Sequence, residues 1–258
     1  MKSKVVKKLK GKILFLFSFV YINMNCLELF SGTHSVGKIL KEKGYNVVSL
    51  DLKDADINCN ILDWDYTTYP KDNFNYIHAS PPCDTFSHCR RSWIGRKLKA
   101  HGDTIITKEI LEEDEKTIGL PILNKTLEII KYFNPKYFTL ENPQTGNMKK
   151  YITDISFTDV DYCMYGLPYK KRTRIWNNFD FKGTLCNKKC GNVVDGRHIS
   201  NCGHTNKKYT SKMNNFTNTS LKDRYRIPEK LIKSWIDSFG KCETEDESEE
   251  DDEVKNNT

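Results

Sequence analysis

The stretch CLELFSGTHSVGKILKEK, residues 26–43, decides the fold class of this chain. It begins with a short apolar run that is typical of a buried strand, and its last nine residues have the pattern of a helix. Glycines at positions 32 and 37 mark the turn between the two. A strand that passes through a tight glycine turn directly into a helix is the opening unit of an α/β sheet.

Other segments repeat this alternation of strands and helices. Four further β-rich runs lie at residues 45–51, 75–80, 136–141 and 157–163. Residues 118–133 carry apolar side chains at helical spacing. Short strands that alternate with helices predict a doubly wound α/β domain with a parallel sheet.

The turn at residues 29–37 is a candidate nucleoside site. Its glycines let backbone N–H groups approach a ligand, and Asp51 ends the next strand, where a carboxylate can bind ribose hydroxyls. His34 stands where the dinucleotide fingerprint has a further glycine, which disfavours a pyrophosphate. S-adenosylmethionine, a nucleoside without phosphates, remains compatible, and so does a tight turn that binds nothing.

Asp56 and Ile57 follow a third short segment that would lie near the same crevice. The carboxylate of Asp56 could contact an adenine edge. The alternative is a solvated surface acid.

The run YIHASPPCDTFSH, residues 76–88, places Cys83 behind two prolines. The prolines fix the backbone and should project the thiol from the carboxyl end of a strand, where α/β proteins bind ligands. Because a free thiol has a pKa of about 8.5, nearby cations would be needed to raise its thiolate fraction. The arginines at 90, 91, 172 and 174 are candidates. Cys83 is then a nucleophile, a metal ligand or a buried structural thiol.

Two more motifs lie at the ends of strands that should reach this crevice. In FTLENP, residues 138–143, Glu141 could exchange hydrogen bonds with a heterocycle, or be a surface acid that starts a turn. In YGLPYKKRTRI, residues 165–175, Arg172 and Arg174 face the same side of a strand. They form either a clamp for an anion or base, or a solvated basic edge.

Taken together, the order LFSG, SPPC, ENP and YGLP with Arg-x-Arg resembles the cytosine-C5 DNA methyltransferase family, especially its short viral and phage-like members. The resemblance covers about residues 25–178. It implies a Rossmann-like class I S-adenosylmethionine-dependent methyltransferase fold with a small irregular recognition insertion. By the same resemblance Cys83 would be the nucleophile, Glu141 would act at the cytosine ring N3, and Arg172 and Arg174 would assist at a flipped-out base. The residues implied to hold the cofactor are Phe30, Ser31, Gly32, Thr33, Asp51, Asp56 and Ile57.

Several positions depart from the family pattern. Pro143 stands where Val is most common, Tyr169 replaces a Gln, the Arg-x-Arg pair lies one residue late, and RYRIP at residues 224–228 replaces Gly-Asn-x-Val-Pro. These departures leave open a catalytically inactive nucleic-acid-binding module. RNA is an alternative substrate. Methylation of an exocyclic amino group is an alternative reaction, although Cys83 stands where that chemistry uses an aromatic residue.

The charge distribution predicts a polyanionic partner. The chain carries a net charge of +7, and residues 241–258 hold nine acidic residues and two lysines, which leaves 39 bases against 25 acids in the rest. The body therefore has a net charge of +14. The polar, basic residues 84–116 are predicted to form a long loop with little core, and the acidic tail to be disordered.

A second chemical feature lies in residues 182–220, here termed the recognition segment, which is poor in large apolar residues. Its thiols and imidazoles could form a tetrahedral zinc site. The predicted ligands are Cys186, Cys190, Cys202 and His204, with His198 as the alternate. The alternative is a set of free cysteines in a loop that reads the DNA sequence.

The nine scattered cysteines favour a reducing compartment, so we expect an intracellular protein of cytoplasm or nucleus. Residues 1–23 combine a basic stretch with a ten-residue apolar run that is too short to span a bilayer. We interpret them as an extension ahead of a methyltransferase domain at residues 24–240. A surface anchor and a signal peptide are the alternatives.

Overall fold

The structure is a computed structural model that describes residues 24–201, 204–205 and 224–239. The expectations for residues 1–23 and for the acidic tail at 241–258 lie outside the described residues.

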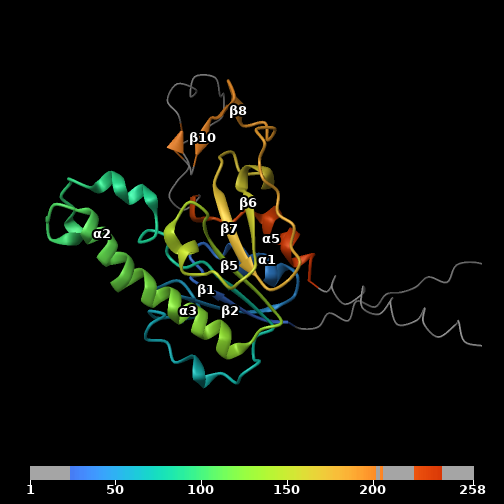
Figure 1. The fold of residues 1–258 in the computed structure, drawn as a ribbon. Helices are drawn as coiled ribbons and strands as arrows, with labels where there is room; N and C mark the ends of the chain where they lie inside the picture. Colours follow the sequence, from blue (N-terminus) through green and yellow to red (C-terminus); the bar gives the residue numbers. More distant parts are fainter. Residues whose placement is uncertain (1–23, 202–203, 206–223, 240–258) are drawn as a thin grey trace, which may run out of the picture.

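A single twisted sheet forms the centre of the molecule (Figure 1). Among the described residues it has seven strands in the order β3-β2-β1-β4-β5-β7-β6. Their bounds are β1 Asn25–Leu29, β2 Asn46–Asp51, β3 Ile57–Asn58, β4 Tyr76–Ala79, β5 Tyr137–Pro143, β6 Phe157–Asp161 and β7 Arg172–Asn177. Every strand expected from the sequence is present, and the predicted α/β class is confirmed.

The sheet has its topological switch point between β1 and β4. From β1 the chain builds outward through β2 and β3 on one side, and then returns to add β4 and β5 on the other. All of these pairs are parallel. A crevice therefore opens at the carboxyl ends of β1 and β4, which is where doubly wound sheets bind ligands.

The prediction of a parallel sheet fails at its far edge. Strand β7 lies between β5 and β6 and is antiparallel to both. The 3₁₀ turn at Tyr162–Tyr165 and Gly166, whose φ is 93°, turn the chain back immediately after β6. Because a parallel connection needs a crossover of about a dozen residues or more, this short link enforces an antiparallel pair.

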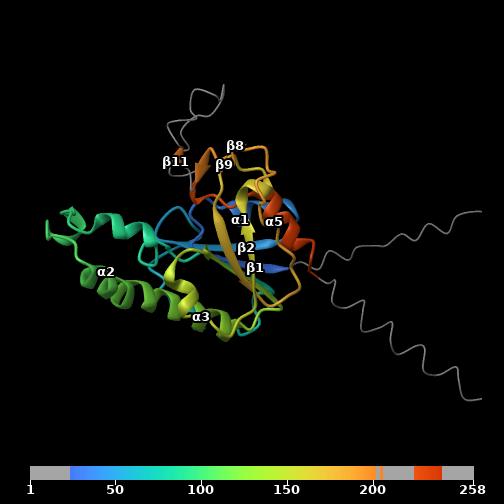
Figure 2. The same cartoon turned by 45° about the horizontal axis from the view of Figure 1, so that its top comes forward.

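Helices cover both faces of the sheet (Figures 1 and 2). Helix α3, Leu120–Phe133, packs its buried side on one face, where Leu123, Ile129 and Phe133 join the core. Helices α1, Ser35–Glu42, and α5, Glu229–Ile236, contact each other on the opposite face. None of the helices in the described part of the chain is long and apolar enough to cross a membrane.

Residues 84–116 are more ordered than predicted. Two 3₁₀ turns, His88–Trp93 and Lys99–His101, precede helix α2, Lys108–Asp114. A π turn at Glu115–Gly119 joins α2 to α3, so the helical region begins ten residues before the predicted start. Thr107 caps α2 by accepting a hydrogen bond from the Ile110 N–H, a start signal that polar composition alone obscures.

The described part of the recognition segment forms two short antiparallel pairs. Strands β8, Val193–Val194, and β9, Arg197–His198, make the first, and β10, Ser200–Asn201, and β11, His204–Thr205, make the second. Lys170, which lies just before β7, connects this segment to the central sheet by a bridge to Asn201.

Candidate active site

A cavity of about 690 Å³ lies at the switch point of the sheet. Strands β1, β2, β4, β5 and β7, or the loops that follow or precede them, contribute to its walls. The lining residues include Phe30, Ser31, Gly32, Thr33, Asp51, Cys83, Glu141, Lys171, Tyr225 and Ile227. The structure thus brings together most residues that the sequence singled out.

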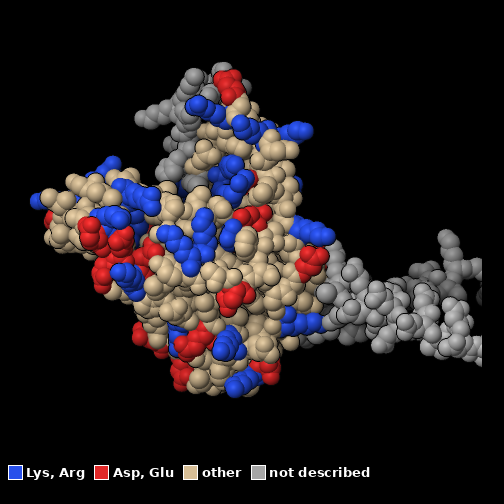
Figure 3. Space-filling view, in the orientation of Figure 1, with Lys and Arg blue, Asp and Glu red and all other residues tan. Residues whose placement is uncertain are grey.

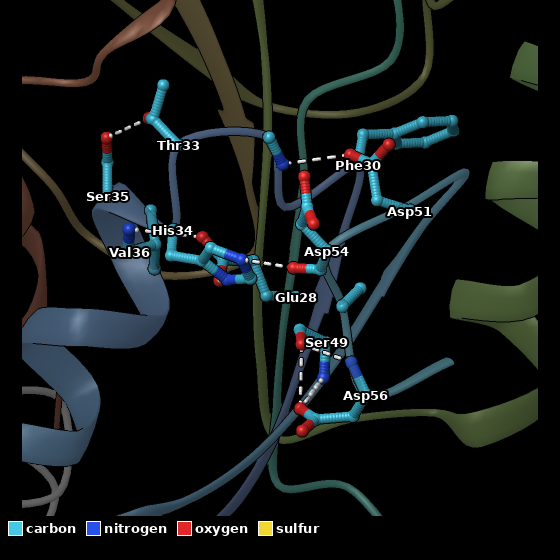
Figure 4. Close-up of polar contacts among 12 residues, drawn as sticks. Glu28, Phe30, Thr33, His34, Ser35, Val36, Ser49, Asp51, Asp54 and Asp56 are labelled. Carbon is cyan, nitrogen blue, oxygen red and sulfur yellow. Dashed lines mark hydrogen bonds and ion pairs between the residues drawn. The ribbon is translucent and has the colours of Figure 1, made fainter. Parts of the chain in front are cut away.

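The turn after β1 forms one wall of the cavity (Figure 4). The Gly32 N–H donates a 2.8 Å hydrogen bond to Asp51 Oδ2, which ties the turn to the end of β2. Phe30, Gly32 and His34 all have positive φ, at 60°, 45° and 54°. A non-glycine residue adopts such a conformation only where its surroundings enforce it, so the turn has a specific shape.

Glu28 of β1 fills the space beneath the N-terminus of α1 (Figure 4). Its side chain is 3% exposed, and Oε1 accepts a 3.1 Å hydrogen bond from the Val36 N–H. A Cβ on Gly37 would lie 2.4 Å from Glu28 Oε2, so a larger residue there would displace the Glu28 carboxyl group. Burial raises the pKa of Glu28 to about 7. The carboxyl group occupies the position that a phosphate would take at a helix N-terminus, which agrees with a cofactor that has no phosphates.

Asp56 and Ile57 do not line the cavity. Asp56 Oδ2 accepts hydrogen bonds from the Ser49 N–H at 2.9 Å and the Ser49 hydroxyl at 2.7 Å, which lower the pKa of the Asp56 carboxyl (Figure 4). Lys53 and Asp54 line the cavity instead. The adenine contact predicted for Asp56 therefore has no support in this geometry.

Cys83 lines the cavity after β4, and the loop that carries it is firmly held. The buried Asn142 side chain donates a 3.0 Å hydrogen bond to the Pro81 carbonyl, and the Ser80 hydroxyl donates to the Phe30 carbonyl. Burial raises the pKa of the Cys83 thiol, and the nearby Lys171 ammonium opposes this effect. The thiol is presented to the cavity but depends on a neighbouring cation for ionisation.

Glu141 is 6% exposed and has two polar partners in the cavity wall. Its Oε1 accepts a 2.8 Å hydrogen bond from the Tyr162 hydroxyl and lies 3.4 Å from Lys171 Nζ. Lys171 Nζ also lies 4.9 Å from the centre of the Tyr162 ring. These contacts fix the carboxyl group of Glu141 beside the thiol-bearing loop.

Arg172 and Arg174 face away from the cavity. Arg172 forms a two-bond ion pair with the buried Asp161, at 3.0 and 2.8 Å, and Arg174 forms one with Asp159, at 2.8 and 3.0 Å. Neither arginine lines the cavity. Of the other predicted cations, Arg90 is buried against Asp114.

Lys171 is the cation that sequence reasoning missed. The signal was the register of the strand, because the Arg-x-Arg pair lies one residue late relative to the family pattern. Successive side chains on a strand point to opposite faces. A shift of one residue therefore turns Arg172 and Arg174 away from the cavity and places Lys171 on the cavity side.

The RYRIP segment also reaches the cavity. Tyr225 and Ile227 line it, and the Ile227 N–H donates a 3.3 Å hydrogen bond to the Ser35 hydroxyl at the start of α1. The place of this motif before the last helix was the only sequence signal for such a contact.

A second cluster joins the recognition segment to the end of β6. Cys163, Cys186, Cys190 and His198 direct three sulfur atoms and one imidazole nitrogen to within 4.8 Å of one another. The cluster includes the predicted Cys186 and Cys190 and the alternate His198, and it adds Cys163, which the sequence analysis did not name. Cys202 lies outside the described residues, and only the backbone of His204 is described.

Lysine and arginine side chains gather on residues 84–116, here termed the α2 arm, on the recognition segment and on the surface between them (Figure 3). Exposed examples are Arg91, Arg96, Lys97, Lys99, Lys188, Lys189 and Arg197. Such a surface attracts a polyanion.

Comparisons with known proteins found one curated relative at high sequence identity. No family model matches the chain. The chain is 40% identical, in an alignment of 228 residues that covers 83% of this chain and 99% of the relative, to the "Probable DNA (cytosine-5)-methyltransferase" of Frog virus 3 (isolate Goorha).

Two solved structures show weaker similarity. A triple mutant of Spodoptera frugiperda DNMT2 is 17% identical with a TM-score of 0.41, over 65% of this chain and 56% of that one. S. pombe Dnmt2 methyltransferase is 14% identical with a TM-score of 0.37, over 63% of this chain and 51% of that one.

Proposed function

Because this chain belongs to the DNA (cytosine-5)-methyltransferase family, we propose that it transfers a methyl group from S-adenosylmethionine to C5 of cytosine in DNA. The observation that carries the proposal is one cavity that contains both a nucleoside-type turn and the side chains of Cys83, Glu141 and Lys171.

S-adenosylmethionine fits the turn side of the cavity. The volume of about 690 Å³ is within the range of cofactor sites. Glu28 and His78 are among the lining residues, and their buried Oε2 and Nε2 atoms have no hydrogen-bond partner within the described residues, so this side of the cavity holds spare polar groups for a ligand. We assign cofactor binding to Phe30, Ser31, Gly32, Thr33 and Asp51, with Tyr225 and Ile227 as the cover.

Cys83 is the proposed nucleophile. Its thiolate attacks C6 of the cytosine ring and forms a carbon–sulfur bond, while Glu141 stabilises a proton at N3. The electron density moves to C5, which becomes an enamine carbon able to accept a methyl cation. The bound cofactor supplies the electrophilic methyl group. A base then removes the C5 proton, and the carbon–sulfur bond breaks to release Cys83 as the thiolate.

Lys171 is the proposed assisting cation. Its ammonium group lowers the pKa of the Cys83 thiol and contacts Glu141 at 3.4 Å, so it serves both groups. Arg172 and Arg174 could assist at the base only if their ion pairs with Asp161 and Asp159 opened. We therefore give the role that the sequence predicted for them to Lys171.

DNA is the proposed partner. A cytosine inside a stacked duplex cannot meet both Cys83 and the cofactor, so the base must be flipped into the cavity. The basic side chains that gather on the α2 arm and on the recognition segment (Figure 3) can bind phosphates near the target. RNA cytosine is the alternative substrate, because phosphate contacts do not distinguish the two nucleic acids.

We also propose that the Cys/His cluster binds a structural zinc ion, because thiolates and imidazoles are the donors that zinc prefers. The thiols must stay reduced to bind metal. This requirement supports the intracellular location expected from the scattered cysteines.

The test is transfer of tritiated methyl groups from S-adenosylmethionine to unmethylated duplex DNA, with nucleoside analysis of the product. We expect 5-methylcytosine with wild type and with Cys89→Ser, an exposed cysteine that does not line the cavity. Cys83→Ser should bind the cofactor but produce none.

A covalent complex with DNA that contains 5-fluorocytosine gives a second readout of the same nucleophile. Transfer only to RNA would change the substrate. Cofactor binding without transfer to either nucleic acid would overturn the enzymatic proposal in favour of a binding module.

A further inference from the structure

The four residues of the Cys/His cluster come from two separate parts of the chain. Cys163 lies in the 3₁₀ turn directly after β6, whereas Cys186, Cys190 and His198 belong to the recognition segment. Cys163, Cys186 and His198 are 5%, 8% and 9% exposed. Three thiols and one imidazole that meet in a buried position gain little from hydrogen bonds to one another, because thiols are weak hydrogen-bond partners.

The distances within the cluster match a tetrahedral zinc site. His198 Nε2 lies 3.3 Å from Cys186 Sγ, 3.5 Å from Cys190 Sγ and 3.7 Å from Cys163 Sγ. With Zn–S bonds of about 2.3 Å and a Zn–N bond of about 2.0 Å at tetrahedral angles, a nitrogen and a sulfur ligand lie about 3.5 Å apart. The imidazole nitrogen is therefore already spaced from all three sulfur atoms as a ligand of one ion would be.

The position of Cys163 gives the site a consequence for DNA recognition. Asp161, two residues before Cys163, pairs with Arg172 of β7 and accepts a 2.8 Å hydrogen bond from the Cys186 N–H. Tyr162, between Asp161 and Cys163, donates the hydrogen bond that holds Glu141. The recognition segment and the active-site strands thus meet within three consecutive residues.

The described part of the recognition segment has little apolar packing to hold it there. In residues 182–201 the buried apolar side chains are those of Cys186 and Ile199. A metal ion could supply the missing free energy, since zinc binding contributes directly to the folding of small segments.

From this geometry we infer that Cys163, Cys186, Cys190 and His198 bind one zinc ion, which fastens the recognition segment to the end of β6 and so makes DNA binding metal-dependent. The ligand set stands independently of the methyl-transfer reaction, whereas the effect on DNA rests on the proposed function. The cofactor turn belongs to β1 and β2, so cofactor binding should not need the metal.

The first experiment measures metal content in the purified full chain and in variants. We expect about one zinc per chain in wild type, in Cys59→Ser and in Cys202→Ser, and a loss of most zinc in Cys163→Ser. Cys59 is the matched control, since it is a partly buried thiol outside the cluster. Retention of full zinc by Cys163→Ser, or its loss from Cys202→Ser, would overturn the ligand set.

A cobalt-substituted wild-type protein keeps the inference testable if Cys163→Ser does not fold. We expect visible d–d bands of a tetrahedral ion together with thiolate-to-cobalt charge-transfer bands of three-thiolate strength. An octahedral spectrum without charge-transfer bands would contradict the site.

The second experiment removes the metal from wild type with a chelator and follows two affinities. The affinity for duplex DNA should fall on the order of tenfold, as basic side chains of the recognition segment lose their fixed positions. The affinity for S-adenosylmethionine should stay the same. Unchanged DNA affinity in metal-free protein would show that the ion does not position the segment, while the Cys83 test of methyl transfer would remain unaffected.

Discussion

The catalytic cavity and the recognition segment are built in opposite ways. The cavity is formed by loops at the ends of strands that are fully buried, as with Leu27, Leu29 and Ile77, so the core itself positions its side chains. The described recognition segment has two-residue strands and a cluster of thiols. Hydrophobic packing can position the side chains of the cavity, and metal ligands can position the recognition segment. We therefore expect different conditions to disrupt the two regions.

The largest expected effect breaks catalysis without disturbing the recognition segment. Glu141→Gln removes the group proposed to stabilise a proton at the base, so the rate of methyl transfer should fall by about 10²–10⁴-fold. Cofactor affinity and zinc content should not change. Glu112→Gln, an exposed helix position, is the control and should be fully active. If zinc content fell in Glu141→Gln, the two regions would not be independent.

The second effect concerns the stability of the cavity wall. Glu28 has a pKa of about 7 in the folded protein against 4.5 as the reference value, so the folded state retains a proton that the unfolded state releases between these pH values. The free energy of unfolding should therefore fall as pH rises from 4.5 to 7 and then stay lower, by at most about 3 kcal/mol.

Glu28→Gln removes this titration. The difference in free energy of unfolding between wild type and variant, measured by urea denaturation across the pH range, should change in the same window. A difference that does not depend on pH would show that Glu28 does not hold its proton in the folded state.

The third effect is smaller and separates Lys171 from its neighbours. Lys171→Gln should raise the pKa of Cys83 further, since the ammonium group now lowers it. The rate of methyl transfer at neutral pH should fall about tenfold, and the rising limb of the pH–rate profile should move to higher pH. Lys171→Arg should restore much of the rate. An unshifted pH profile would exclude Lys171 from thiol ionisation, and Lys125→Gln on α3 serves as the control.

The smallest effect tests the outward arginines. Arg174 pairs with Asp159 and stacks 3.4 Å from the ring centre of Phe157. Arg174→Gln should lower the free energy of unfolding by about 1 kcal/mol and leave the rate of methyl transfer unchanged. Lys182→Gln breaks a highly exposed pair and should have no measurable effect. A loss of rate in Arg174→Gln at full stability would return that residue to the active site.

The sequence could predict the features that local patterns determine. Strands β1, β2, β4 and β5 and the turn at Phe30–Thr33 were found because local patterns determine them. The start of α2 was missed because polar composition hides a helix whose cap is a single threonine.

The features that the sequence did not reveal concern contacts between distant segments. Which of Lys171 and Arg172 faces the cavity depends on the register of β7, and the convergence of Cys163 with Cys186 and Cys190 depends on how the recognition segment docks. A sequence shows spacing along the chain, and neither docking nor strand register follows from spacing alone.

The carboxyl group of Glu28 beneath α1 should also make the cavity select against nucleotides that carry phosphates. Nucleotides such as ATP share an adenosine with S-adenosylmethionine, and an open helix N-terminus would attract their phosphates. Here the Val36 amide already has an internal acceptor, so a polyphosphate gains no binding energy from it. The protein should therefore be resistant to competition by ATP. Excess ATP that weakened cofactor binding in a titration would show that the amides remain open to phosphate.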